Sequence, residues 1–72
     1  PTVIADVPRD CRMVVSESFG PLAPVLKVRD LDDALTLANS TAYGLSSGVV
    51  TTNLNNAMKA VRTLRCGTVN IN

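Results

Sequence analysis

The spacing of apolar and polar positions changes several times along this chain, and each change marks the boundary of a predicted element. Residues 22–29 alternate at every second position, which predicts a β-strand. Apolar residues then recur at every third or fourth position through residues 31–40, which predicts an amphipathic helix. Asp30 is the expected N-cap of this helix, because its side-chain oxygen can accept from an N–H of the first turn.

The same succession is repeated in the second half of the chain. Residues 47–51 form a short apolar run typical of a strand. An apolar stripe from residue 54 to residue 64 predicts a second helix, capped by Thr52 or Asn53. We expect Gly67 to close this helix in the left-handed conformation that glycine adopts without strain.

The order of the elements predicts how they are connected in space. Residues 68–72 complete a strand–helix–strand–helix–strand series, which favours parallel pairing with right-handed crossovers. Residues 1–4 form a further short extended run, and residues 12–15 are a brief apolar stretch before the segment 16–21. The expected fold class is therefore α/β, with one open, mostly parallel sheet and two covering helices.

Length and composition limit how stable such a unit can be. The chain has 72 residues, and Phe19 and Tyr43 are its only aromatic residues, so its core must be aliphatic. A chain of this size buries only about 60% of the surface of its unfolded form. We expect residues 1–72 to be a single partial domain of a larger protein, and the absence of an initiating Met fits an internal fragment.

Charge and cysteine content exclude several classes of partner. The net charge is +1 and the basic residues are interleaved with acidic ones, so no basic stripe indicates nucleic-acid binding. No apolar run has the length of a membrane span, and the first residues lack the pattern of a signal peptide. Cys11 and Cys66 lie far apart in a chain without His, which does not give metal-ligand spacing. We expect a protein of the reducing cytoplasm.

Candidate chemistry is concentrated between residues 16 and 21. Glu17 and Phe19 stand two positions apart beside a Gly-Pro turn, in a segment without strand or helix periodicity. Such a segment presents side chains rather than burying a face. Taken alone, Glu17 could be merely solvated and Phe19 a small core anchor. Tyr43, followed by Gly and Leu, reads as a turn with a packed aromatic ring.

Six motifs in register resemble the aldehyde dehydrogenase superfamily and cover nearly the whole chain. They are Pro1-Thr2-Val3, Asp6-Val7, Glu17-x-Phe19-Gly20-Pro21, Asp30-x-x-x-Ala34, Ala38-Asn39-x-Thr41-x-Tyr43-Gly44-Leu45 and Gly67-Thr68-Val69-x-Ile71-Asn72. One such motif would be weak, whereas six in order are specific. The resemblance implies the C-terminal portion of that family's catalytic domain, over residues 1–72.

The resemblance also implies two residues that contact a cofactor, NAD or NADP. The glutamate that matches Glu17 accepts hydrogen bonds from the nicotinamide-ribose hydroxyls, a task suited to a carboxylate with two charged acceptor oxygens. The phenylalanine that matches Phe19 packs against the same ribose and helps to hold the nicotinamide for hydride transfer. No catalytic residue and no metal ligand is expected within this chain.

The reaction implied for the parent protein is oxidation of an aldehyde to a carboxylic acid. It proceeds by thiolate attack, hydride transfer to the nicotinamide and hydrolysis of the thioester. The family's nucleophilic cysteine lies upstream of the Glu17 loop and matches nothing here, so the chain alone should be inactive. Cys11 and Cys66 are expected to be small buried apolar groups.

Several alternatives stay open at this point. Ser16, Ser18 and Asn70 depart from the residues usual in the family, which blurs assignment to a subfamily. A CoA-acylating or semialdehyde-specific relative would share these motifs, and a non-catalytic α/β interaction domain is the alternative from another class. We expect an aldehyde substrate, NAD or NADP as cofactor, and a homo-oligomer for the parent.

Overall fold

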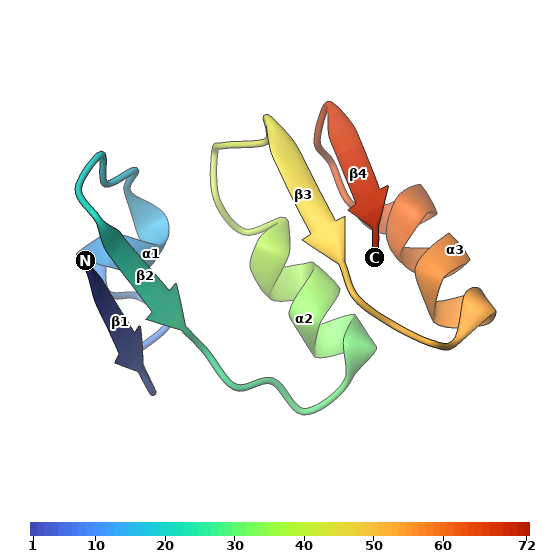
Figure 1. The fold of residues 1–72 in the computed structure, drawn as a ribbon, viewed down its shortest axis with the longest axis horizontal. Helices are drawn as coiled ribbons and strands as arrows, with labels where there is room; N and C mark the ends of the chain where they lie inside the picture. The colour runs from blue at the N-terminus through green and yellow to red at the C-terminus, as the bar shows by residue number, and fades with distance from the viewer.

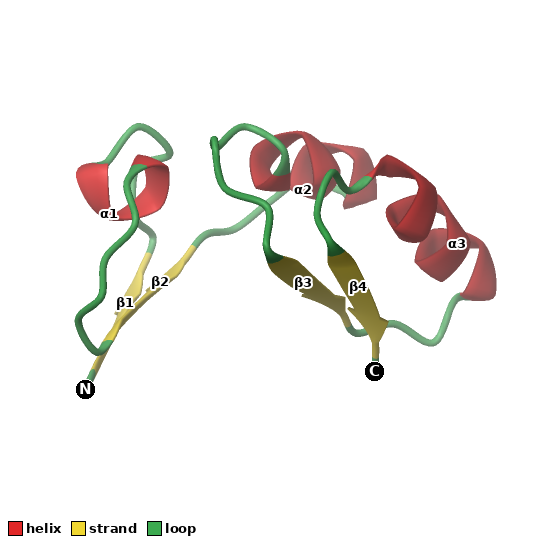
Figure 2. Ribbon diagram, turned by 90° about the horizontal axis from the view of Figure 1, so that it is seen from above, coloured by secondary structure: helices red, strands yellow, loops and turns green.

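The computed structural model describes residues 1–72 as seven short elements. In chain order they are β1 (Thr2–Ala5), α1 (Arg12–Val15), β2 (Leu22–Val25), α2 (Leu31–Ala38), β3 (Ser46–Val49), α3 (Leu54–Thr63) and β4 (Thr68–Ile71). Figure 1 shows the four strands pointing in one direction, and Figure 2 shows the helices on one side of them. The predicted α/β class is confirmed.

The strands form two separate sheets rather than the single sheet expected. β1 pairs with β2 and β3 pairs with β4, both in parallel, and β2 exchanges no hydrogen bond with β3. The registers begin at Thr2 opposite Leu22 and at Ser46 opposite Thr68. We call β1, α1 and β2 the first unit, and α2, β3, α3 and β4 the second unit. The sequence pattern predicts strands, but it does not say which of them become neighbours.

The small core lies entirely in the second unit. Only four of the 72 residues are buried, namely Asp33, Leu35, Ala57 and Ala60, and all belong to α2 or α3. Small alanine side chains let the two helices approach each other. The first unit contributes no buried residue, so its position depends on other contacts.

Helix starts follow the sequence prediction closely. The Asp30 side chain accepts a hydrogen bond of 2.8 Å from the Asp33 N–H, and Asn53 accepts one of 3.1 Å from the Asn56 N–H. Each satisfies one of the N–H groups that a helix leaves unpaired at its first turn. Of the two caps considered for α3, the structure has Asn53.

Element ends differ from the prediction. The strand expected over residues 22–29 ends at Val25, because its partner β1 ends at Ala5, where Asp6 turns the chain with a φ of 56°. The helix expected over residues 31–40 ends at Ala38.

The end of α3 and the nature of α1 are further corrections. No glycine has a positive φ, so Gly67 does not close α3 in the expected way. Instead, the extended residue Leu64 follows the helix, and its N–H donates to the Ala60 carbonyl oxygen. The apolar stretch 12–15 is one helical turn, α1. No helix has both the length and the apolar character that crossing a bilayer requires.

Candidate functional site

Two loops from different units line one open cavity of about 280 Å³. The loop between α1 and β2 contributes Glu17 and Ser18, and the loop between α2 and β3 contributes Thr41 and Tyr43. The rest of the lining comes from α1 and β2, including the apolar residues Met13, Val14, Leu22 and Pro24. The fold therefore brings together two of the six motifs that carry the resemblance, the one that contains Glu17 and the one that contains Thr41 and Tyr43.

Glu17 and Phe19 are both presented to the outside, as expected for this loop. Glu17 is exposed and takes part in none of the four ion pairs, so its carboxylate oxygens are free to accept hydrogen bonds. Phe19 is 96% exposed and does not line the cavity. A phenyl ring this exposed has no packing role within the chain, which excludes the interpretation as a core anchor. The cofactor contacts of both residues stay predictions.

The backbone before Glu17 is arranged by the single turn α1. The Ser16 N–H donates to the Arg12 carbonyl oxygen at 2.9 Å and ends the turn directly before Glu17. Farther along, the Gly20 N–H donates to the Ser18 hydroxyl at 3.4 Å, a local bond within the loop. Ser18, one of the departures from the family pattern, thus contributes to the shape of the loop without touching the Glu17 carboxylate.

The opposite wall of the cavity is held by close backbone contact. The Gly67 N–H donates to the Gly44 carbonyl oxygen at 2.9 Å, and a Cβ on Gly44 would lie 2.6 Å from the Arg65 carbonyl oxygen. Glycine is required at position 44 because a side chain has no room there. Tyr43 next to it is 54% exposed, so the turn is confirmed but the ring is not packed as predicted.

Asn39 fastens the end of α2 to the end of α3. Its side-chain NH₂ group donates to the Thr63 carbonyl oxygen at 2.8 Å, and its side-chain oxygen accepts from the Arg65 N–H at 2.9 Å. One amide thus donates to a carbonyl oxygen that the end of α3 leaves unpaired and accepts from an N–H just beyond that helix. The motif residue Asn39 has a structural role that fixes where the Thr41–Tyr43 wall begins.

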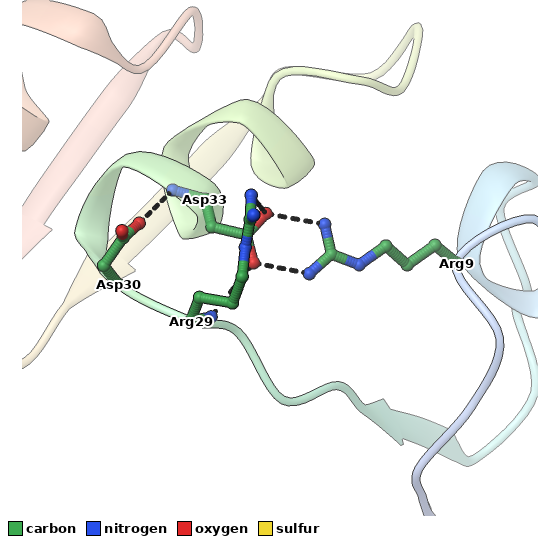
Figure 3. Close-up of polar contacts among 4 residues, drawn as sticks. All are labelled: Arg9, Arg29, Asp30 and Asp33. Carbon is green, nitrogen blue, oxygen red and sulfur yellow. Dashed lines mark hydrogen bonds and ion pairs between the residues drawn. The ribbon is translucent and has the colours of Figure 1, made fainter.

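Arg9 and Asp33 form a bidentate ion pair between distant parts of the chain, which Figure 3 shows in detail. The two terminal nitrogens of Arg9 donate to the two carboxylate oxygens of Asp33 at 2.8 and 2.6 Å. The Arg29 N–H adds a third hydrogen bond at 3.0 Å, and the Asp33 side chain is only 4% exposed. These donors, Arg9 first, hold the pKa of the Asp33 carboxyl well below its usual range.

Sequence reasoning missed this pair. In the sequence, Asp33 is only an acid in the first turn of a predicted helix, where the helix dipole favours anions. Its partner Arg9 lies 24 positions away. No local signal marks such a contact, because only the packed chain brings the two segments together.

The two cysteines are free thiols, and both are partly buried rather than fully buried as expected. The Cys66 sulfur lies 3.0 Å from the Ser47 hydroxyl oxygen and 3.3 Å from the Thr68 carbonyl oxygen. These contacts place Cys66 in a polar, structural setting beside β3 and β4. They do not bring it to the cavity that Glu17 lines.

Comparison with known proteins identifies the class. Residues 1–72 match the model of the aldehyde dehydrogenase family over their whole length. Retinaldehyde dehydrogenase 3 of Mus musculus is 46% identical over 72 residues, which are 100% of this chain and 14% of the relative. The chain belongs to the aldehyde dehydrogenase family, and it spans about 14% of the length of such relatives.

Solved structures agree with the fold. The crystal structure of lactaldehyde dehydrogenase from Escherichia coli is 41% identical, with a TM-score of 0.95 over 99% of this chain and 15% of that one. A 1-pyrroline-5-carboxylate dehydrogenase from Thermus, crystallised with bound NAD, is 37% identical, with a TM-score of 0.95 over 99% of this chain and 14% of that one. The arrangement of the two units is thus one that family members adopt.

Proposed function

We propose that this chain is the C-terminal portion of the catalytic domain of an NAD(P)-dependent aldehyde dehydrogenase, which oxidises an aldehyde to a carboxylic acid. The observation that carries the proposal is the family match over residues 1–72 together with the exposed Glu17 loop at a cavity. Within that enzyme, Glu17 and Phe19 contact the nicotinamide ribose. The cofactor, when bound, accepts a hydride from the substrate.

The chemistry of the loop fits a ribose with two neighbouring hydroxyl groups. Glu17 has no internal ion-pair partner, and its two oxygens can each accept one O–H. A charged acceptor makes each of these bonds stronger than a neutral one would. Phe19 offers an uncovered ring face, against which a sugar can pack. The two side chains lie two positions apart, so the same loop sets both contacts.

The chain's own contribution is orientation rather than bond breaking. Holding a reacting group in place can contribute several kcal/mol, within the limit of about 7–11 kcal/mol for well-oriented reactions. The nucleophile, the base and the dinucleotide-binding region belong to other parts of the enzyme. For this reason the chain by itself is expected to be inactive.

Two further properties complete the proposal. The proposal includes a homo-oligomeric parent enzyme, as the family resemblance implies. Both thiols are free, and free thiols are usual in the reducing cytoplasm, where we place the enzyme.

Replacing Glu17 by Gln in the full-length enzyme tests the ribose contact. The amide keeps one acceptor and loses the charge, at a cost of about 1–3 kcal/mol. Hydride transfer should therefore slow by about 10- to 100-fold, since about 1.4 kcal/mol is a factor of ten. Single-turnover formation of reduced cofactor, with a deuterated aldehyde to isolate the hydride step, measures it.

Asp32→Asn is the matched control, because it makes the same carboxylate-to-amide change at an exposed side chain of α2. Its loss is limited to the surface ion pair with Lys59, and exposed pairs contribute little. The isolated 72-residue chain serves as a blank. An unchanged hydride step in Glu17→Gln, or reduced cofactor formed by the blank, would contradict the proposal.

A further inference from the structure

The first unit is held against the second by very few contacts. None of the buried residues belongs to β1, α1 or β2. Apart from the linker after β2, no backbone hydrogen bond joins the two units, since those outside helices and strands stay within one unit or at its turns. Within residues 1–72, the orientation of the first unit therefore depends on side chains.

The Arg9–Asp33 pair is the one polar contact that spans the units. Of the four ion pairs, Lys59–Asp32 stays within the second unit, while Lys27–Asp6 and Arg29–Asp33 involve the linker. Arg9 alone reaches from the first unit into the first turn of α2. Its bidentate geometry fixes direction as well as distance, because a planar guanidinium and a carboxylate meet in one plane.

Apolar packing does not replace this contact. An open cavity of about 380 Å³ lies beside Arg9, between α1 and α2, with Val15 on one side and Thr36 and Leu37 on the other. A cavity at this place means that the helices are not packed tightly together here. The ion pair at its edge thus ties the loop before α1 to the first turn of α2.

Both walls of the Glu17 cavity extend from the elements that this pair joins. Arg9 lies in the loop before α1, and α1 ends at Val15, two residues before Glu17. Asp33 lies in α2, which ends at Ala38, three residues before Thr41. A rotation of α1 about α2 would shift Glu17 against Tyr43 without unfolding either element. We propose that Arg9 is a positioning residue, which acts through Asp33 to set the Glu17 loop for cofactor binding. This inference rests on the proposed function.

The test uses the full-length enzyme and three variants. Arg9→Met removes the pair, and Arg9→Lys keeps the charge but loses the planar fork. Lys59→Met removes the exposed pair of Lys59 with Asp32, which lies within the second unit and is the matched control. The readouts are titration of each variant with NADH and with NADPH by fluorescence, the separate values of kcat and KM for the cofactor with propanal as substrate, and the thermal midpoint.

Arg9→Met should raise the Kd of the reduced cofactor by about tenfold and lower kcat/KM further, since a displacement of about 1 Å can cost up to about 100-fold. Arg9→Lys should fold with the thermal midpoint of the wild type and still bind the cofactor several-fold more weakly. Lys59→Met should bind it as the wild type does. This pattern supports positioning, because a purely structural role would change the thermal midpoint alone.

Two negative results have different meanings. Wild-type enzyme that binds neither NADH nor NADPH overturns the proposed function and this inference with it. Wild-type enzyme that binds reduced cofactor, while Arg9→Lys and Arg9→Met bind it equally well, overturns this inference alone.

Discussion

Gly44 lies where the loop before β3 meets the backbone that follows α3. An added Cβ would be 2.6 Å from the Arg65 carbonyl oxygen, a distance at which the backbone itself must move. Gly48 in β3 has no atom within 4 Å of the same virtual Cβ. Neither glycine has a positive φ, so the two positions differ in the room available for a side chain and not in a need for left-handed backbone.

Gly44→Ala should therefore destabilise the protein, and Gly48→Ala should not. Forcing a methyl group into a filled site typically costs about 1–3 kcal/mol. At an open strand position, alanine is equal to glycine or better by about 0.5–1 kcal/mol. Thermal midpoints of the two variants and the wild type, measured side by side, check this. Equal losses for both would mean that the close approach at Gly44 does not matter.

At the same scale, the sequence predicted the exposed loop better than the contacts behind it. The exposure of the loop that carries Glu17 and Phe19 could be predicted because a turn without periodicity is a local property, whereas their role was implied by the family resemblance. The packing of Tyr43 could not, because it depends on what lies beside the loop. Gly67 is instructive, since the sequence signal for glycine was real but its cause was close approach to the Leu45 carbonyl oxygen, 3.0 Å from a virtual Cβ.

At the scale of the elements, neighbouring residues in the sequence determine where a helix starts, whereas distant residues determine its orientation. The side chains of Asp30 and Asn53 cap their helices by accepting a hydrogen bond from the N–H of the residue three positions later. Sequence spacing alone specifies this contact. The end of β2 depends on the length of β1, and the angle of α1 depends on the pair formed by Arg9 and Asp33. Such features need the folded chain, so only part of the candidate site could be predicted.

The lowered pKa of Asp33 gives the contact between the Arg9 loop and α2 a definite dependence on pH. A carboxyl with a depressed folded pKa stabilises fully above its unfolded value of about 3.9. This stabilisation is lost as the pH falls towards the lower folded value. The difference in urea midpoint between wild type and Asp33→Asn should thus be constant from about pH 7 to 5 and shrink below about pH 4.

Urea unfolding of the 72-residue chain at low micromolar concentration measures this difference at each pH. Asn cannot ionise, so the variant removes the titration at this position while keeping the side-chain size. A difference that persists unchanged to about pH 2 would show that Arg9 and the Arg29 N–H do not act on the Asp33 carboxyl as described.

At the scale of the whole molecule, the chain has two open two-stranded sheets and only four buried residues. Much of its surface is therefore available for contact with other surfaces. The four buried residues lie between α2 and α3, whereas the sheet face away from the helices is exposed at Ser46, Gly48, Thr68 and Asn70. Each two-stranded sheet leaves both of its outer edges unpaired. The order of the elements predicts parallel strands, and from it we expected a single sheet. It does not determine whether β2 and β3 lie close enough to pair, and in the structure they do not pair.

The isolated chain should therefore self-associate through strand edges. Val3 lies in β1 and is 73% exposed, so Val3→Lys, which adds a charge at that strand, should shift the population towards monomer. Analytical ultracentrifugation over a range of concentrations checks both. A wild-type chain that stays monomeric at high concentration and unfolds cooperatively would show that its core is self-sufficient.

The cavity at Glu17 is mechanically asymmetric. The wall that carries Tyr43 is held at the ends of α2 and α3 by the hydrogen bonds of the Asn39 amide and by the close backbone contact at Gly44. The wall that carries Glu17 belongs to the first unit, whose only polar contact with the second unit is the bidentate pair of Arg9 with Asp33. In the proposed cofactor site, we therefore expect the Glu17 loop to move when a ligand binds, while the loop that carries Tyr43 keeps its position.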